Sequence, residues 1–298
     1  METDLRPRSA RIEPKGRARM RFWNTPPLGT IWRWLPALAW LFITLFPVYW
    51  LFNVVFLPSG SAVAIQPPLF PTSLSAGFEK LGEIAANTSF GRAYLVSFIF
   101  ASLQIFGILV ITSLAAYEFA LFDFPGKNFL FLLALSSMMV PPAVTLIPLF
   151  RMIASIHWIN TFQGLAVPGM ASALSLFIMR QHMEEIPLDL IDAAEIDGAS
   201  HFQTFRYVAL PLSKNALLTV GIVAFVYAWS SYLWPLVVAN SPNMYTVSVL
   251  IAGLSATRSY TTIDQVIGAY FLAMLPPVLI YLFLQRFIME NVTLSGFE

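Results

Sequence analysis

Six apolar stretches of about 20 residues limit what this 298-residue chain can fold into. A helix of about that length crosses the hydrocarbon core of a bilayer. Lipid offers no partner for an unpaired backbone N–H or C=O, so each stretch is expected to be helical. The sequence therefore predicts an all-α integral membrane protein. The six predicted spans are Trp34–Leu57, Tyr94–Ala120, Phe129–Phe150, Phe162–Met179, Ala216–Val238 and Ile267–Phe287.

The composition supports lipid as the solvent for most of the chain. Charged residues make up 11% of the sequence and hydrophobic residues 57%, whereas a soluble domain carries about 25% charged residues. Aromatic residues reach 15%, and aromatic rings are enriched where helices meet lipid headgroups. The net charge of +1 gives no long-range attraction to nucleic acid. We therefore do not expect nucleic-acid binding.

The distribution of basic residues predicts the orientation of the spans. With the N-terminus in the cytoplasm, 13 of the 17 Lys and Arg residues lie on the cytoplasmic side, as the positive-inside rule requires. An even number of spans then returns the C-terminus to the cytoplasm. The predicted sections are a basic cytoplasmic segment 1–33, a first span 34–57, an extracytoplasmic loop 58–93 with a short amphipathic piece at Phe78 to Ala86, a core transmembrane domain 94–287 and a cytoplasmic tail 288–298.

Prolines recur inside or beside the predicted spans. Each proline removes a backbone donor, so a neighbouring helix or water must take up the carbonyl that it frees. Ordinary kinks within a bundle and broken helices that line a solute path are both consistent with this pattern. The prolines concerned are Pro47, Pro141, Pro142, Pro148, Pro168, Pro235, Pro276 and Pro277.

The cytoplasmic loop 181–215 within the core domain is too long for a tight turn and too polar to cross the membrane. Pro187 suits the first turn of a helix, and apolar residues recur every third residue from Leu188. A neighbouring stripe of the same helix is acidic. The loop has six acids within fourteen residues, at Glu184, Glu185, Asp189, Asp192, Glu195 and Asp197.

Gly198 interrupts this loop with a residue that adopts backbone conformations which other residues avoid. A second short helix is expected after it, ending near Pro211. Its apolar side would be formed by Phe202, Phe205, Ala209 and Leu212. Acidic runs are usually solvated loops. A helix, glycine, helix plan with large aromatics is instead typical of a rigid docking knob, whose acidity would suit a basic partner.

The same loop resembles the EAA loop of permeases of ATP-binding-cassette importers. That family's pattern is Glu-Ala-Ala, two variable residues, Asp-Gly-Ala, and then Phe and a Leu-Pro-Leu group. The matching residues are Asp192-Ala193-Ala194, Asp197-Gly198-Ala199, Phe205 and Leu210-Pro211-Leu212, with Asp192 in place of the leading Glu. The resemblance extends from about Tyr94 to the C-terminus. Trp234-Pro235-Leu236 and Gln285-Arg286 resemble the carbohydrate branch, the maltose-type second permease.

This resemblance implies the type I importer permease fold and its mechanism. In such permeases the EAA knob docks in a cleft of a cytoplasmic ATPase, and closure of the ATPase pair rocks the spans between inward- and outward-facing states. Asp192 would supply the charge contact and Gly198 the turn. The residues implied in ATPase coupling are Asp192, Ala193, Ala194, Glu195, Asp197, Gly198, Phe205 and Pro211.

The resemblance also implies partners. A homologous second permease, two ATPase subunits and an extracytoplasmic solute-binding protein would complete an importer in the bacterial cytoplasmic (inner) membrane. No P-loop is present around Gly126-Lys127, because Asn128 follows and no glycine stands five residues before. ATP and Mg²⁺ are therefore expected on the partner ATPases. This chain is expected to bind no cofactor or metal and to have no catalytic residue.

Aromatic and hydroxyl side chains near the end of the fifth predicted span offer chemistry suited to a sugar. The candidates are Trp229, Ser230, Ser231 and Tyr232. Gln104 joins them as a polar residue within the second predicted span. Anchoring of the aromatic rings at the membrane interface is the alternative.

Other functions compete with a sugar importer. An ion-coupled secondary transporter places ionisable residues within its spans, but none of the six has a central Asp, Glu, Lys or His. A membrane enzyme is not favoured, because the three His residues form no metal-ligand pattern. Within the importer class a neutral sugar or oligosaccharide is preferred. Glycerol phosphate or an acidic oligosaccharide is the alternative, with Arg92 and Arg151 as the basic residues near the outer ends.

Overall fold

The computed structural model describes residues 27–58, 60–61, 68–87, 89–256 and 263–294, and every regular element within them is helical. Residues 1–26 of the predicted basic segment, 295–298 of the predicted tail, and Arg258 lie outside the described residues. The chain divides into two compact units, Met1–Trp50 and Leu51–Glu298.

In the first unit the described residues belong to α1 (Pro27–Val55), whose last turn falls in the second unit. From Trp34 to Tyr49 the side chains are exposed, although most are apolar. The rings of Phe42, Phe46 and Trp50 follow one another at helical spacing, with centroids 5.8 and 6.1 Å apart. A helix that is apolar all round is suited to a lipid environment.

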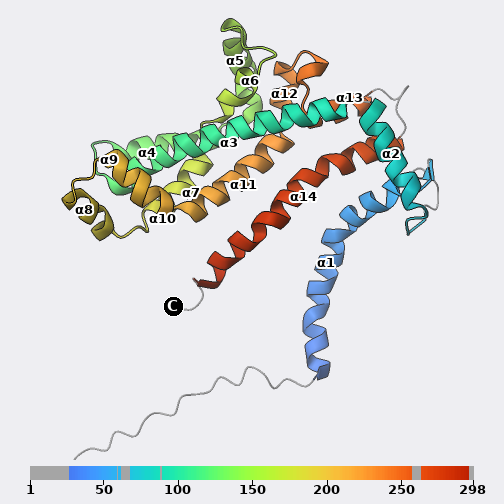
Figure 1. Cartoon of the computed structure of the whole chain (residues 1–298), viewed down its shortest axis with the longest axis horizontal. Helices are drawn as coiled ribbons and strands as arrows, with labels where there is room; N and C mark the ends of the chain where they lie inside the picture. Colours follow the sequence, from blue (N-terminus) through green and yellow to red (C-terminus); the bar gives the residue numbers. More distant parts are fainter. Residues whose placement is uncertain (1–26, 59, 62–67, 88, 257–262, 295–298) are drawn as a thin grey trace, which may run out of the picture. The chain divides into compact units, whose positions relative to one another are not determined.

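The second unit is organised around α3 (Phe90–Leu121), which packs along α7 (Ala173–Met183) and α11 (Lys214–Ser230) (Figure 1). Small residues on its buried side let the neighbouring backbones approach closely, as is common between helices in membranes. These small buried residues include Ala93, Ser97, Ala101 and Gly107. One apolar cluster surrounds the first half of α3 and a second surrounds its last turns.

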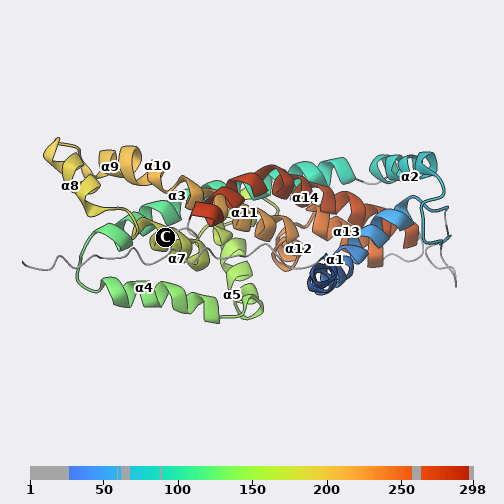
Figure 2. The same ribbon diagram turned by 90° about the horizontal axis from the view of Figure 1, so that it is seen from below.

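The predicted span Phe129–Phe150 is not one straight helix. The structure has α4 (Lys127–Ser136), a 3-10 turn, and α5 (Pro142–Ser155), which bends away by 101° (Figure 2). Pro141 follows Val140 and forces it into an extended conformation, and Pro142 begins the new helix. Similarly, the predicted span Phe162–Met179 comprises α6 (Phe162–Ala166), a 3-10 turn at Pro168, and α7, with a bend of 49°.

The predicted span Ala216–Val238 is too long at its end. The helix α11 stops at Ser230, Ser231 is extended, and α12 (Leu233–Val238) is a separate short helix. A further helix that the hydropathy pattern did not predict, α13 (Val247–Ala256), follows a 3-10 turn at Pro242–Met244. The predicted amphipathic piece at Phe78 to Ala86 is confirmed as part of α2 (Leu74–Asn87).

The last helix, α14 (Ile263–Leu294), continues through Pro276 and Pro277. In a helix these two prolines free the carbonyls of Leu272 and Ala273, four residues earlier. The hydroxyl of Tyr94 on α3 donates to the Leu272 carbonyl, and the indole N–H of Trp229 on α11 donates to that of Ala273. This confirms the expectation that neighbouring helices take up carbonyls freed by prolines.

Among the described residues, three helices are long and apolar enough to cross a membrane, within α1, α3 and α14. The number rises to six if each of three bent pairs counts as one span. Two of these pairs are the broken spans described above, and the third joins residues 201–212 to α11 at a bend of 76°. The hydropathy pattern thus located the apolar segments but not their bends.

Candidate coupling site

The loop between α7 and α11 forms two short helical segments, which we call the coupling knob (residues 188–212). Its first helix is α8 (Leu188–Ile196), which begins directly after Pro187 as predicted. Ile191 is buried and joins the apolar cluster at the last turns of α3. Ile196, in contrast, is 86% exposed. One face of α8 therefore packs on the protein while another, partly apolar and partly acidic, is open.

The break after α8 is a backbone motif that requires glycine. Gly198 has φ of +83°, a conformation that costs other L-residues energy. The N–H of Gly198 donates to the Glu195 carbonyl and that of Ala199 to the Ala194 carbonyl, both at 3.0 Å. This pair of bonds is the Schellman motif, which satisfies the last carbonyls of a helix. The predicted role of Gly198 as the turn residue is confirmed for the backbone.

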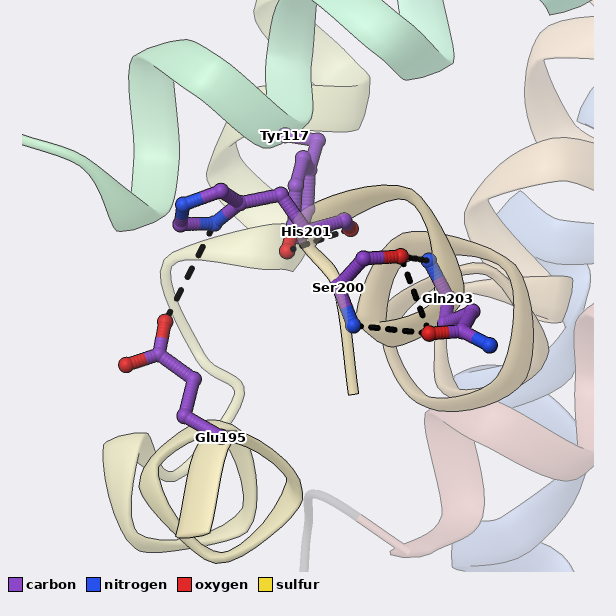
Figure 3. A network of polar contacts seen from close by, with 5 residues as sticks. All are labelled: Tyr117, Glu195, Ser200, His201 and Gln203. Carbon is purple, nitrogen blue, oxygen red and sulfur yellow. Dashed lines mark hydrogen bonds and ion pairs between the residues drawn. The ribbon is translucent and has the colours of Figure 1, made fainter. Parts of the chain in front are cut away.

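The next helix starts with a capping box, drawn in Figure 3. The N–H of Gln203 donates to the Ser200 hydroxyl at 3.4 Å, and the Gln203 side-chain oxygen accepts the Ser200 N–H at 2.8 Å. Both bonds satisfy donors that the first turn of a helix leaves free. The Schellman motif and the capping box thus satisfy the backbone groups on both sides of the break between the two helices.

The second half of the knob consists of α9 (His201–Thr204), a π-helical turn (Phe205–Ala209) and α10 (Leu210–Leu212). Phe205 and Ala209 are buried, as expected, but Phe202 and Leu212 are exposed. The prediction of one continuous apolar side is therefore wrong. The π turn, closed by the Leu210 N–H to the Phe205 carbonyl, widens the helix and changes its register.

Three of the six acids in the loop have basic neighbours within the chain. Glu184 pairs with Arg180 at 2.8 Å, Glu185 lies 3.8 Å from His182, and Glu195 lies 3.9 Å from His201. The other three are exposed and make no ion pair in the part of the chain that the structure describes. They are Asp189, Asp192 and Asp197. Ala193 is exposed and Ala194 half-buried, while Pro211 is exposed on α10.

The candidates for a solute path lie in two different environments. Gln104 is 2% exposed and donates to the Gly169 carbonyl at 3.2 Å, while Trp229 is 5% exposed and bonded to α14. Both belong to the packed interior of this chain. Ser230 and Tyr232 are exposed and Ser231 is half-buried, at the break between α11 and α12. Two of the five candidate residues for a solute path are therefore buried, and the other three are at least partly exposed.

Two residues with several long-range contacts, Asn160 and Tyr117, were assigned no structural role from the sequence. Asn160 has φ of +60°, and its side-chain oxygen accepts from the N–H of Asn240, and from the N–H and hydroxyl of Ser241, each at 3.1 Å. Tyr117 links α3 to the knob through the His201 carbonyl. The partners lie 80 or more residues apart, so no local pattern reveals them. In the described residues no group of three His, Cys, Asp or Glu could hold a metal ion.

Several comparisons with known proteins give the same result. Residues 108–293 match the family of binding-protein-dependent transport system inner membrane components. The sn-glycerol-3-phosphate transport system permease protein UgpE of Salmonella typhi is 34% identical over 249 residues, covering 82% of this chain and 89% of its own length. UgpE of Shigella flexneri serotype 5b is 32% identical over 265 residues, covering 87% and 94%.

A solved structure supports the same fold. The structure described as that of a bacterial ABC transporter involved in the import of the acidic polysaccharide alginate has a chain that aligns with a TM-score of 0.76 at 18% identity. The alignment covers 88% of this chain and 98% of the other. At this identity the likeness concerns the fold.

The apolar helices and broken spans, together with the family match, identify a multi-pass helical permease of the inner membrane. More specifically, the chain belongs to the family of binding-protein-dependent transport system inner membrane components, the permease subunits of ABC importers. Its curated relatives are transport permeases and not enzymes.

Proposed function

We propose that this permease imports a polyhydroxylated solute, a sugar, an oligosaccharide or a sugar phosphate, and that its coupling knob docks on partner ATPase subunits. The observation that carries the docking proposal is the open face of α8, where Asp189 and Asp192 are unpaired in the described chain and Ile196 is exposed. An apolar residue rimmed by acids suits a cleft with an apolar floor and basic edges.

The proposed assembly follows from the family. Two ATPase subunits would bind and hydrolyse ATP with Mg²⁺, a homologous second permease would complete the path, and an extracytoplasmic solute-binding protein would deliver the solute. The six segments would cross the membrane with both termini in the cytoplasm. Since the chain has no cysteine, single-cysteine labelling at Ile196→Cys and Phe70→Cys, two exposed positions, tests this orientation without background.

The identity of the solute is proposed at the level of chemistry. UgpE relatives are named for sn-glycerol 3-phosphate. At the break after α11, the exposed Ser230 and Tyr232 and the half-buried Ser231 offer hydroxyl and ring contacts. Gln104 and Trp229 are buried, so they would contribute through the packing of α3 and α11 and not by contact with the solute. Transport assays with sn-glycerol 3-phosphate and with neutral sugars separate the two solute classes. Tyr232→Ala should raise the half-saturating solute concentration, whereas Tyr270→Ala on α14 should not.

The docking proposal is tested by co-purification of ATPase subunits through a tag on this chain. Gly198→Asp should reduce the amount of retained ATPase about 10-fold or more, as loss of an interface anchor does. Gly126→Asp is the matched control. Gly126 also has φ of +83°, and a Cβ there would meet no atom within 4 Å, but it lies in another turn. Equal retention by wild type and both variants would refute docking through the knob.

A further inference from the structure

The knob is fastened to α3 by a contact that the docking role does not require. The Tyr117 hydroxyl, on the last turns of α3, donates to the His201 carbonyl (Figure 3), at 3.2 Å. The Tyr117 side chain is buried, at 3% exposed. The ring of Tyr117 meets the Phe205 ring edge to face, with centroids 5.3 Å apart. A buried ring and a hydrogen bond thus hold one side of the knob.

Phe122, just beyond the end of α3, adds to the contact between α3 and the knob. Its ring meets the Tyr117 ring and the His201 imidazole edge to face, with ring centroids 5.2 and 5.0 Å apart. His201 in turn lies 3.9 Å from Glu195 on α8. Ile191 of α8 belongs to the same apolar cluster as Tyr117 and Phe122, so both helices of the knob are linked to the end of α3 through side chains.

The chain connects the knob to α7 and α11 only through non-helical or bent segments. At one end the chain leaves α7 through the non-helical residues 184–187, and at the other it bends by 76° at Ser213 before α11 begins. In contrast, α3 is a continuous helix of 32 residues that packs against both α7 and α11. A displacement of the knob that reaches α3 would move the helices around it together.

We propose that Tyr117, supported by Phe122, is the positioning residue that transmits movement of the coupling knob to α3. This inference rests on the proposed function, because it assumes that ATPase subunits move the knob. Docking uses the open face of α8, and transmission uses the buried side at Tyr117. The two roles are therefore separable by mutation.

The test uses the assembled importer in proteoliposomes and compares solute imported per ATP hydrolysed. Tyr117→Phe keeps the ring and removes only the hydroxyl. The ratio should fall about 5-fold, the factor that corresponds to loss of one hydrogen bond of about 1 kcal/mol, with retained ATPase and basal hydrolysis unchanged. Thr112→Val is the matched control, since the buried Thr112 hydroxyl on the same helix donates to the Ile108 carbonyl of α3 itself. Its ratio should equal that of wild type.

A second variant and a stability measurement distinguish a loss of coupling from a folding defect. Phe122→Leu leaves the Tyr117 hydroxyl in place and should lower the ratio by a smaller factor, with thermal unfolding midpoints recorded for all variants. A Tyr117→Phe ratio equal to wild type overturns the proposal, and so does loss of ATPase retention in this variant, which would place Tyr117 in docking. Absence of any ATPase with wild type would instead refute the proposed function itself.

Discussion

The indole N–H of Trp229 donates at 3.0 Å to the carbonyl of Ala273, the group that Pro277 leaves without its helical partner. The Trp229 ring stacks on Phe225 and meets Tyr94 edge to face. The side chain thus closes a gap in the hydrogen bonding of α14 from a neighbouring helix. Trp229, which the sequence suggested for solute contact, therefore has a structural role between α11 and α14.

Because the Trp229 indole bonds the carbonyl that Pro277 frees, substitutions of these two residues should have non-additive effects on the free energy of unfolding. Trp229→Phe should lower the free energy of unfolding by about 1 to 2 kcal/mol, through the lost bond and the smaller ring. In a Pro277→Ala background the new backbone N–H bonds the Ala273 carbonyl, so Trp229→Phe should cost about 1 kcal/mol less there. Denaturant titration in detergent measures both values.

Trp234→Phe is the control for this double-mutant comparison. The Trp234 indole N–H donates to the carbonyls of Gly164 and Leu165 at 3.1 Å, which have no relation to Pro277. Its effect should add to that of Pro277→Ala. Equal costs of Trp229→Phe in the two backgrounds would show that the indole N–H does not replace the helical bond.

A second prediction concerns the close approach at Gly164 on α6. A Cβ at this position would overlap the backbone carbonyl oxygen of Trp158, which cannot move aside as a side chain can. Gly164→Ala should therefore destabilise the protein by about 1 to 3 kcal/mol. Gly82→Ala on α2 has open space and should be neutral or stabilise by up to about 1 kcal/mol. Thermal unfolding in one detergent compares the two, and a similar loss for both would contradict the steric reason.

The sequence predicted the apolar segments and the break in the knob, because both depend on local chemistry. A run of apolar residues predicts a span wherever it occurs, and the φ of +83° at Gly198 follows from a helix end that needs glycine. The resemblance to the importer family also rested on contiguous residues. These are the features for which neighbours in sequence contain the necessary information.

Features that depend on packing were not predictable in this way. The bends within two spans depend on how neighbouring helices accept a proline break, since Pro141 bends the chain while Pro276 does not end α14. Trp229 and Ser230 are adjacent, yet one is buried and the other exposed. Which helix face meets a neighbour is decided by tertiary contacts such as that of Tyr117 with His201, 84 residues apart.

The last prediction concerns Asp264, in the first turn of α14. This residue is 5% exposed, one carboxylate oxygen accepts the N–H of Gly60, and the other has no hydrogen-bond partner. Gly60 has φ of +85°, and the Lys80 ammonium donates to the nearby Leu57 carbonyl at 3.0 Å. Two ionisable side chains from different helices therefore hold the turn after α1.

Asp264→Ala removes the acceptor and should lower the free energy of unfolding by about 1 to 3 kcal/mol, because the Gly60 N–H loses its partner. Asp264→Asn keeps an acceptor and removes a buried charge, so it should cost less than the alanine variant. Asp123→Asn, at a fully exposed carboxylate paired with Lys127, should give no measurable change. Denaturant titration of the three variants ranks them, and an asparagine variant as unstable as the alanine variant would show that the charge of Asp264 is required.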